Sequence, residues 1–330
     1  MPRTPPAESP ALESARRDRP PAILLMGPTA SGKTDLALML AGSLPCEIIS
    51  VDSALVYRGM DIGTAKPSPE VLREVPHRLV DICDPAEAYS AARFCDDALA
   101  AMEEITAAGR VPLLVGGTML YFRALQQGLS PLPQSDPALR GELAERARRE
   151  GLEAMHRWLA RVDPAAAARI HPNDPQRLLR ALEVYLLAGR PMSELWQSAQ
   201  RPDLGHRLLK LVRSPRERAT LHRRIARRFE AMLAAGFEDE VRGLWARGDL
   251  SPEMPSMRCV GYRQMLDYIQ GRRAHADMVL AAIAATRQLA KRQYTWLRSE
   301  PGCSWLYDDM PLEVQAREAV TRFCEASTGL

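Results

Sequence analysis

The sequence has few aromatic residues and lacks the cysteine patterns of metal-binding or disulfide-stabilised proteins. Aromatic residues make up 5% of the 330 residues, whereas hydrophobic residues at 46% provide for a sizeable buried core. Six cysteines are scattered without a CxxC pair. Neither a zinc knuckle nor a disulfide framework is therefore expected, and a reducing compartment is the simpler interpretation. The six histidines show no metal-ligand spacing either.

Long apolar runs are also missing. No stretch approaches the roughly 20 residues that are needed to cross a bilayer. Residues 1–21 contain six prolines and four arginines but no apolar centre, so we expect a disordered tail and not a secretory signal. The net charge of +3 is mild, so any basic partner surface must come from local clustering. These features favour a cytoplasmic globular protein.

Short apolar runs alternate with helical patterns in the first part of the chain. Ala22 to Met26 end at a glycine, which is typical of a buried parallel strand that leads into a turn. The other expected strands are 47–51, 78–82 and 111–115, with helices over 33–41 and 90–108. Because strands that alternate with helices form parallel sheets, the sequence predicts an α/β core.

The strand signal disappears between Pro131 and Gly205, where helix formers dominate. Helices are expected there over 139–149, 152–160 and 176–187. A strand over 207–212 then precedes long helical patterns over 217–247 and 277–298. We therefore predict a core of residues 22–130 and 206–330, with an inserted all-helical domain at 131–205.

A phosphate-binding motif follows the first strand. Residues 27–34 read GPTASGKT, which matches GxxxxGK[ST] between a strand and a helix, as this motif requires. The backbone amides and the helix amino end face phosphate oxygens in such loops. Lys33 is expected to neutralise the distal phosphate, and Thr34 to ligate Mg²⁺. By itself the loop predicts an ATP or GTP user, as in kinases of small metabolites.

Asp52 directly follows the second expected strand. It should lie at the carboxyl end of that strand, where open α/β sheets bind their ligands. Three roles are open for it: a Mg²⁺ ligand, a general base, or a turn cap followed by Ser53. Asp81 and Asp84 flank the third expected strand and compete for the metal role.

Residues 52–67 (DSALVYRGMDIGTAKP), joined to the phosphate loop, strongly resemble tRNA dimethylallyltransferases. Other matching segments extend the resemblance over about residues 22 to 300; they are 77–85, 115–121, 173–180, 236–240, 258–263 and 291–298. No Cys or His pairs stand near the carboxyl end, where eukaryotic members carry a zinc finger. The chain therefore looks bacterial in type.

The resemblance implies a P-loop NTPase-like parallel sheet flanked by helices. It also implies that the loop holds the diphosphate of dimethylallyl diphosphate, and that the acceptor is N6 of a tRNA adenosine beside the anticodon. Asp52 is then the base, Thr34 contacts the diphosphate, Arg228 assists and Mg²⁺ is the cofactor. The implied diphosphate-binding residues are Gly27, Pro28, Thr29, Ala30, Ser31, Gly32, Lys33, Thr34 and Arg224.

The chemistry is consistent with these residue types. An exocyclic adenine amine is a weak nucleophile, so a carboxylate must accept its proton as the new bond forms. The departing diphosphate gathers negative charge that Lys33, loop amides, Mg²⁺ and an arginine can stabilise. An adenine that is stacked in an RNA loop must be extruded to reach such a cleft.

Two basic segments complete the pattern. Residues 213–228 hold seven arginines against the single acid Glu217. Arg224 and Arg228 share one side of a helix, where one could point at diphosphate while the other supports it; a solvated helix face is the alternative. No acid stands between Asp277 and Glu300, where basic residues interleave with aromatic ones, as in RNA-binding surfaces.

The resemblance also implies a set of tRNA contacts. Thr118 follows two glycines, near the cleft or as a helix N-cap, and Trp296 at its helical spacing is more typical of a core residue. The implied tRNA contacts are Asp52, Ser53, Ala54, Leu55, Thr118, Arg140, Gln176, Arg177, Leu178, Leu179, Arg180, Arg258, Cys259, Val260, Gly261, Tyr262, Arg263, Lys291, Arg292, Gln293, Tyr294, Thr295, Trp296, Leu297 and Arg298.

The sequence thus favours a monomeric prenyltransferase that binds the tRNA anticodon stem-loop and dimethylallyl diphosphate, with no membrane partner. The leading alternative is a P-loop kinase of a nucleoside or small metabolite. A non-catalytic RNA-binding protein is disfavoured because Lys33, Thr34 and Asp52 are all intact.

Overall fold

The computed structural model describes residues 19–197, 203–309 and 311–328. The chain divides into two compact units, one formed by the residues up to Phe122 together with those from Asp203 onward, the other by Arg123–Pro202. Residues 1–18 of the expected tail (residues 1–21) lie outside the described residues. Its last three residues belong to the folded core, because Arg19 pairs with Asp203 at 2.5 Å and Pro21 begins the first strand.

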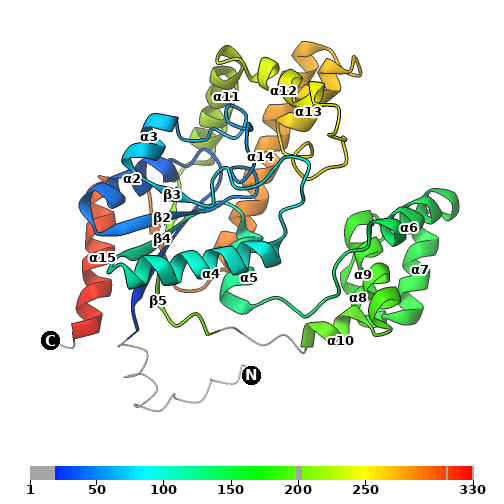
Figure 1. Cartoon of the computed structure of the whole chain (residues 1–330), viewed down its shortest axis with the longest axis horizontal. Helices are drawn as coiled ribbons and strands as arrows, with labels where there is room; N and C mark the ends of the chain where they lie inside the picture. Colours follow the sequence, from blue (N-terminus) through cyan, green and yellow to red (C-terminus); the bar gives the residue numbers. More distant parts are fainter. Residues whose placement is uncertain (1–18, 198–202, 310, 329–330) are drawn as a thin grey trace. The chain divides into compact units, whose positions relative to one another are not determined.

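A single sheet of six parallel strands forms the centre of the first unit, in the order β3-β2-β4-β1-β5-β6 (Figure 1). The predicted parallel α/β fold is confirmed. Because every neighbouring pair is parallel, all six carboxyl ends lie at the same edge of the sheet. The strands are β1 (Pro21–Met26), β2 (Cys46–Val51), β3 (His77–Arg78), β4 (Val111–Gly116), β5 (Arg207–Arg213) and β6 (Cys303–Leu306).

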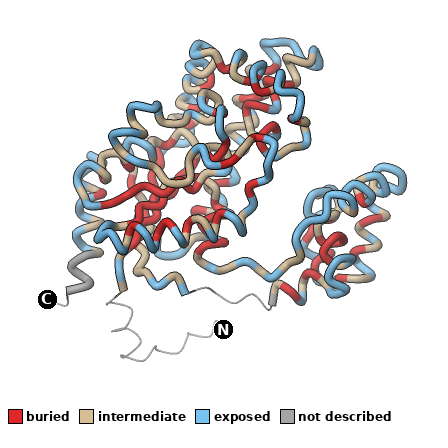
Figure 2. The backbone as a smooth tube through the Cα atoms, in the orientation of Figure 1, coloured by how far each residue is buried: buried red, intermediate tan, exposed pale blue. Residues whose placement is uncertain are grey.

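Helices cover the sheet and bury its apolar side chains (Figure 2). Helix α2 (Lys33–Ser43) packs with α15 (Leu312–Thr328) on one face, where Leu36 and Leu40 contact Ile23 and Ile48. Helix α4 (Ala91–Ala107) packs against β2 and β4, and it begins where the Ser90 hydroxyl accepts a hydrogen bond from a first-turn amide. Each fully buried leucine or isoleucine contributes about 1.5–3 kcal/mol to folding.

The segment after β5 contains four helices, α11 (Arg218–Ala234), α12 (Phe237–Ala246), α13 (Tyr262–Ile269) and α14 (His275–Ser299). The expected continuous helix over 217–247 is wrong, because Gly236 adopts φ 96° and separates α11 from α12. Such a φ suits glycine and ends a helix. Helix α14 packs against both α11 and α13.

Other expectations differ from the structure as well. The third strand contains only His77 and Arg78, because Leu79 and Asp81 have φ angles of 63° and 57°, which a strand does not accommodate. Strand β6 and helices α13 and α15 were not expected, nor were the short helices α3 (Pro69–Glu74) and α5 (Met119–Gln127).

The second unit is entirely helical. It contains α6 (Pro137–Glu150), α7 (Leu152–Val162), α8 (Pro164–Arg169), α9 (Pro175–Ala188) and α10 (Met192–Gln197). Three of these helices begin with an aspartate N-cap followed by proline, at Asp136, Asp163 and Asp174, which is a strong helix start. Their apolar faces form a core of their own. Throughout the residues that the structure describes, no helix is both long and apolar enough to cross a membrane.

Candidate active site

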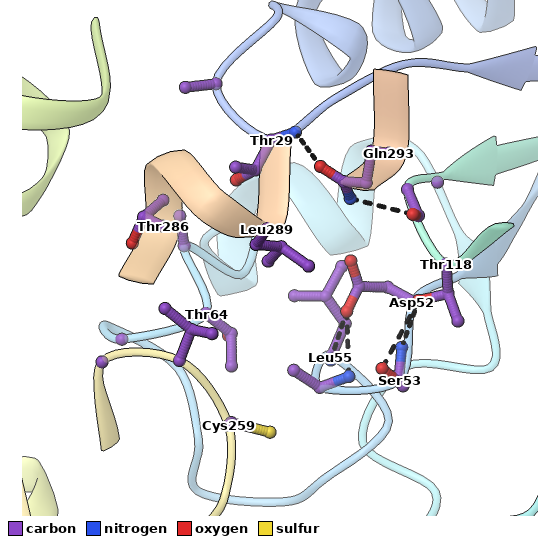
Figure 3. A pocket seen from close by; sticks show the side chains of 18 of the residues that line it. Thr29, Asp52, Ser53, Leu55, Thr64, Thr118, Cys259, Thr286, Leu289 and Gln293 are labelled. Atoms are coloured by element: carbon purple, nitrogen blue, oxygen red, sulfur yellow. Dashed lines mark hydrogen bonds between the residues drawn. The ribbon is translucent and has the colours of Figure 1, made fainter. Parts of the chain in front are cut away.

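A cavity of about 560 Å³ opens at the carboxyl edge of the sheet. Its walls come from the segments that follow β1, β2 and β4 and from α11 and α14 (Figure 3). This is the position where open α/β sheets bind their ligands. The cavity brings together Lys33, Thr34, Asp52, Thr118 and Arg228, which the sequence placed in one site.

The phosphate loop has the geometry that its sequence predicts. Ala30 and Gly32 adopt φ angles of 61° and 86°, which turn the backbone between β1 and α2. Helix α2 begins at Lys33, and no side chain caps its amino end. An uncapped helix amino end presents unpaired N–H groups and a partial positive charge, which favour an anion.

Lys33 is held close to the loop, where its Nζ donates a hydrogen bond of 2.8 Å to the Pro28 carbonyl. Desolvation lowers the pKa of Lys33 to about 8; the nearby Asp52 raises it and Arg228 lowers it further. A bound anion would favour the protonated amine, so the lysine is prepared for a phosphate ligand.

Arg228 and Arg224 have different environments, although both lie on α11. Arg228 lines the cavity, and its Nη2 donates to the Thr64 carbonyl at 3.0 Å. Desolvation lowers its pKa, against the opposing effect of Asp52. Arg224 forms an ion pair of 2.7 Å with Asp308 and is not part of the cavity wall. The structure therefore does not bring Arg224 into the cavity with Lys33 and Arg228, and its expected contact with diphosphate stays a prediction.

Asp52 lies directly after β2 and has one of its three expected roles, that of a turn cap. Its Oδ1 accepts hydrogen bonds from the amides of Ala54, at 2.9 Å, and Leu55, at 3.4 Å, which makes it a turn cap. Asp52 also lines the cavity (Figure 3), and Lys33 belongs to the same wall. The turn orients the carboxylate, and a carboxylate in this position can accept a proton from a ligand in the cavity.

Thr118 supports the neighbouring segment. Its hydroxyl accepts a hydrogen bond of 3.1 Å from the Ser53 amide, and its carbonyl accepts the first backbone bonds of α5. The ends of β2 and β4 are in very close contact here. A Cβ at Gly116 would lie 1.9 Å from the Val51 carbonyl oxygen, so the strands can approach this closely only with glycine at that position.

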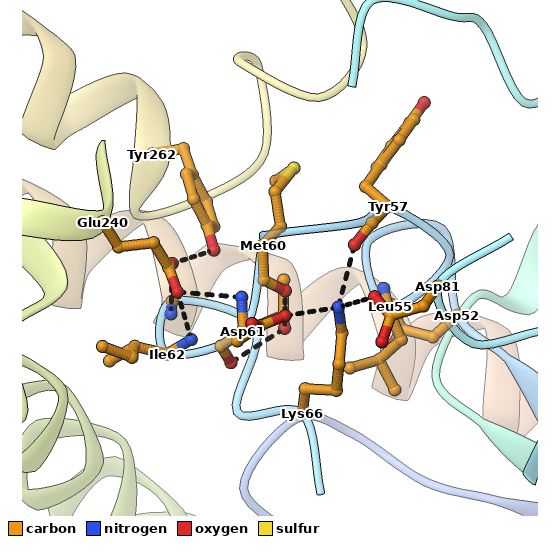
Figure 4. A network of polar contacts seen from close by, with 12 residues as sticks. Asp52, Leu55, Tyr57, Met60, Asp61, Ile62, Lys66, Asp81, Glu240 and Tyr262 are labelled. Atoms are coloured by element: carbon orange, nitrogen blue, oxygen red, sulfur yellow. Dashed lines mark hydrogen bonds and ion pairs between the residues drawn. The ribbon is translucent and has the colours of Figure 1, made fainter. Parts of the chain in front are cut away.

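The two other candidate metal ligands are occupied elsewhere. Asp81 pairs with Lys66, which also binds Asp61 at 2.6 Å (Figure 4), and Asp84 pairs with Arg247 at 2.8 Å. Neither aspartate lines the cavity, so the structure does not bring them together with the phosphate loop. Across the described ranges, no group of three or more His, Cys, Asp or Glu residues could hold a metal by itself.

Glu240 on α12 is a site residue that sequence reasoning missed. Its carboxylate accepts hydrogen bonds from three consecutive amides, of Asp61, Ile62 and Gly63, at 2.9, 2.6 and 3.1 Å, and from the Tyr262 hydroxyl at 2.5 Å (Figure 4). These bonds fix the turn that leads to Thr64, the acceptor for Arg228. The only sequence signal was the matching segment 236–240, which carried no assigned role.

The expected tRNA contacts of the first unit fall into groups. Those that line the cavity are Asp52, Ser53, Ala54, Leu55, Thr118, Arg258, Cys259, Val260, Gly261, Tyr262, Arg292, Gln293 and Trp296. Trp296 thus belongs to the cavity wall and not to the core. Burial raises the pKa of Cys259 to about 12, so its thiol stays protonated. The exposed residues outside the wall are Arg263, Lys291, Thr295 and Arg298.

Some of the expected contacts are engaged inside the fold. The Tyr294 hydroxyl hydrogen-bonds with Ser214 at 2.5 Å, and Leu297 is fully buried. In the helical unit, Leu178 is also buried, whereas Arg180 pairs with the buried Glu183 at 2.8 Å. Leu179 is half-buried, and the exposed members of that group are Arg140, Gln176 and Arg177.

Comparisons with known proteins agree with this geometry. Residues 55–300 match the family of IPP transferases. The chain is 65% identical over 283 residues to a tRNA dimethylallyltransferase of Thioalkalivibrio sulfidiphilus (strain HL-EbGR7), a match that covers 86% of this chain and 88% of that protein.

Solved structures are similar over most of the chain. A full-length tRNA isopentenylpyrophosphate transferase from Bacillus halodurans superposes with a TM-score of 0.67 at 37% identity, over 93% of this chain and 96% of that one. A eukaryotic dimethylallyltransferase that acts on tRNA superposes with a TM-score of 0.76 at 25% identity, over 91% and 77%.

Proposed function

The chain belongs to the IPP transferase family, and we propose that its cavity transfers a dimethylallyl group from dimethylallyl diphosphate to N6 of a tRNA adenosine next to the anticodon. The observation that carries this proposal is that the phosphate loop and the Asp52 carboxylate line one cavity. A diphosphate leaving group and an incoming amine need opposite electrostatic surroundings, and this cavity supplies both.

The leaving group would be held on the side of the loop. The uncapped amino end of α2, Lys33 and Arg228 supply positive charge there. As the bond between carbon and oxygen breaks, the diphosphate gains charge, and these groups stabilise it without further rearrangement. The Arg228 guanidinium is already oriented by the Thr64 carbonyl, which reduces the entropy lost on binding.

The acceptor amine would be deprotonated by Asp52. Its Oδ1 is fixed by the amides of Ala54 and Leu55, so the carboxylate is oriented before a ligand arrives. The exocyclic amine of adenine becomes cationic as it attacks the allylic carbon, and transfer of its proton to Asp52 leaves the neutral prenylated amine.

Enzymes of this kind use a divalent metal with diphosphate substrates. The residues present fit such an ion, which we propose is Mg²⁺, because Thr34 lines the cavity next to the phosphate loop and its hydroxyl could hold the ion together with the substrate phosphates. Mg²⁺ is commonly bound by one or two protein oxygens together with substrate phosphates. When bound, the ion would neutralise part of the diphosphate charge.

The RNA would present an extruded adenosine to the cavity. Arg258, Arg292 and Trp296 form part of its wall, and they offer phosphate contacts and an aromatic surface for stacking. We further propose that the helical unit, through Arg140 and Gln176 to Arg180, contacts the anticodon stem, and that the enzyme acts as a monomer in the cytoplasm. The alternative of a small-metabolite kinase is not supported, because the similar proteins are tRNA prenyltransferases.

One assay separates these activities. The purified full chain is incubated with unmodified tRNA and labelled dimethylallyl diphosphate, and in parallel with labelled ATP and candidate nucleosides. We expect label to move from the prenyl diphosphate to tRNA and the transfer to be lost in Asp52→Ala. Phosphorylation of a nucleoside without prenyl transfer would refute the proposal.

A further inference from the structure

Gln293 on α14 has both ends of its side-chain amide bound to backbone inside the fold. Its Oε1 accepts a hydrogen bond of 2.9 Å from the Thr29 amide, and its Nε2 donates one of 2.8 Å to the Gly117 carbonyl (Figure 3). The residue is 9% exposed. Because one partner is a donor and the other an acceptor, only one orientation of the amide satisfies both.

The two partners of Gln293 belong to different halves of the site. Thr29 is part of the phosphate loop, whereas Gly117 precedes Thr118, whose hydroxyl fixes the Ser53 amide beside Asp52. A Cβ at Gly117 would lie 2.5 Å from Gln293 Nε2 and 3.2 Å from the Gly27 carbonyl oxygen. The loop after β1, the end of β4 and α14 thus meet with no space for a side chain at Gly117.

Apolar contacts of the same helix reinforce this arrangement. Ala290, one turn before Gln293, is buried in a cluster with Leu221 and Ile225, against which Ala30 of the phosphate loop packs. Ala30 has a φ of 61°, which is unfavourable for a residue other than glycine and persists only when its surroundings hold it in place. Helix α14 therefore supports the loop through one apolar and one polar contact.

We propose that Gln293 is a positioning residue for the transfer reaction. By joining Thr29 to Gly117, it keeps the diphosphate-binding loop at a fixed separation from the end of β4, where Thr118 binds the Ser53 amide next to Asp52, and the geometry of the reacting groups depends on that separation. The inference rests on the proposed function. It differs from the expectation that Gln293 contacts tRNA, because its amide is already used in the interior.

A glutamate at this position makes the role testable by pH. A protonated carboxyl group can accept from the Thr29 amide and donate to the Gly117 carbonyl, as glutamine does, whereas a carboxylate repels that carbonyl. Burial raises the pKa of a carboxyl group, so Gln293→Glu should change state within an accessible pH range. The ionisable side chains that line the same cavity are Lys33, Asp52, Arg228, Arg258, Cys259, Tyr262 and Arg292.

The experiment compares Gln293→Glu and Gln293→Ala with wild type and with Gln288→Glu, a control at an exposed position of the same helix. Prenyl transfer to tRNA is measured from about pH 6 to about pH 8 and expressed as a ratio to wild type at each pH, which removes the pH dependence of the reaction itself. Binding of inorganic pyrophosphate and of unmodified tRNA is titrated separately, and thermal unfolding verifies that each variant is folded.

We expect Gln293→Ala to lower transfer by about tenfold to a hundredfold and to weaken pyrophosphate binding, while its tRNA affinity stays within about twofold. The ratio for Gln293→Glu should rise as the pH falls, and the ratio for Gln288→Glu should stay flat. If Gln293→Ala is unfolded, the proposal is tested by the pH dependence of the transfer ratio for Gln293→Glu alone.

The proposal is overturned if the ratio for Gln293→Glu does not change with pH, or if tRNA affinity alone falls in Gln293→Ala. The latter result would make Gln293 an RNA contact. Pyrophosphate titration needs no transfer reaction, so this measurement remains interpretable even if wild type fails to prenylate tRNA and the proposed function is wrong.

Discussion

The Glu240 carboxylate accepts a hydrogen bond of 2.6 Å from the amide of Ile62, a residue 178 positions earlier in the chain. With the adjacent amides and the Tyr262 hydroxyl, this bond fixes the turn that ends at Thr64. One acid on α12 thereby determines where the carbonyl that orients Arg228 lies. Residues 61–64, α11 and α12 are thus connected next to Arg228, which lines the cavity.

Glu240→Gln should therefore destabilise the protein and weaken diphosphate binding. Glutamine retains the shape of the side chain but loses the charge and one acceptor oxygen, and a charge-assisted bond to a partly buried group is worth about 1.5–3 kcal/mol. The free energy of unfolding in urea is the measurement. Glu238→Gln is the matched control, because Glu238 lies on the same helix and pairs with Arg242 at 2.7 Å, a surface pair worth about 0.3–0.5 kcal/mol. Equal stability of the two variants would contradict the role of Glu240.

Asp52→Asn should separate catalysis from structure. Asparagine can still accept the two amide bonds that form the turn, but it cannot take a proton from an amine. We expect transfer to fall by about 10²–10⁴-fold with pyrophosphate binding nearly unchanged. Asp52→Ala removes the cap as well, and it should also lose about 0.5–2 kcal/mol of stability. If Asp52→Asn prenylates tRNA at the wild-type rate, Asp52 is excluded as the base.

Pyrophosphate affinity should fall as the pH rises through about 8, where Lys33 loses its proton. The sign follows from the lowered pKa: below this value the amine is charged and attracts the anion, and above it the charge is lost. Titration calorimetry from about pH 7 to about pH 9 measures this change in affinity. Lys33→Ala is the reference, because the pH dependence of its affinity includes the ionisation of pyrophosphate but not that of Lys33. Parallel curves for the two proteins would show that Lys33 does not titrate in this range.

Arg228→Ala should weaken pyrophosphate binding by more than Arg224→Ala does. Arg228 lines the cavity, whereas Arg224 is paired with Asp308 outside its wall. Removing a charge-assisted contact to the ligand costs about 1.5–3 kcal/mol, and loss of the Arg224 pair costs about 0–1 kcal/mol of stability without a direct effect on the ligand. If Arg224→Ala weakens pyrophosphate binding as much as Arg228→Ala does, Arg224 also contacts the diphosphate.

The sequence was sufficient for features that depend on neighbouring residues. The phosphate loop is recognisable because its glycines, Lys33 and Thr34 act within one turn between a strand and a helix. Asp52 was placed correctly at the edge of the sheet because parallel strands have a shared direction. The helix expected over 90–108 is similarly local, and α4 spans Ala91–Ala107.

Features that depend on distant contacts were not predictable. Nothing in the local sequence of Glu240 or Gln293 shows that their partners lie far away in the chain. The positive φ of Leu79 shortened β3, although leucine does not favour that conformation. Asp81 also has a positive φ, which aspartate adopts more readily, and it pairs with Lys66 outside the cavity wall.

The contact between Gly116 and the Val51 carbonyl limits how this enzyme can be altered. Because even one methyl group would force the two strands apart where Asp52 and Thr118 emerge, directed evolution of acceptor preference has no freedom at that position. If Gly116 is randomised together with the cavity residues, all active clones should retain glycine at this position. We expect new acceptor preferences to come from other residues that line the cavity, such as Arg258 and Trp296.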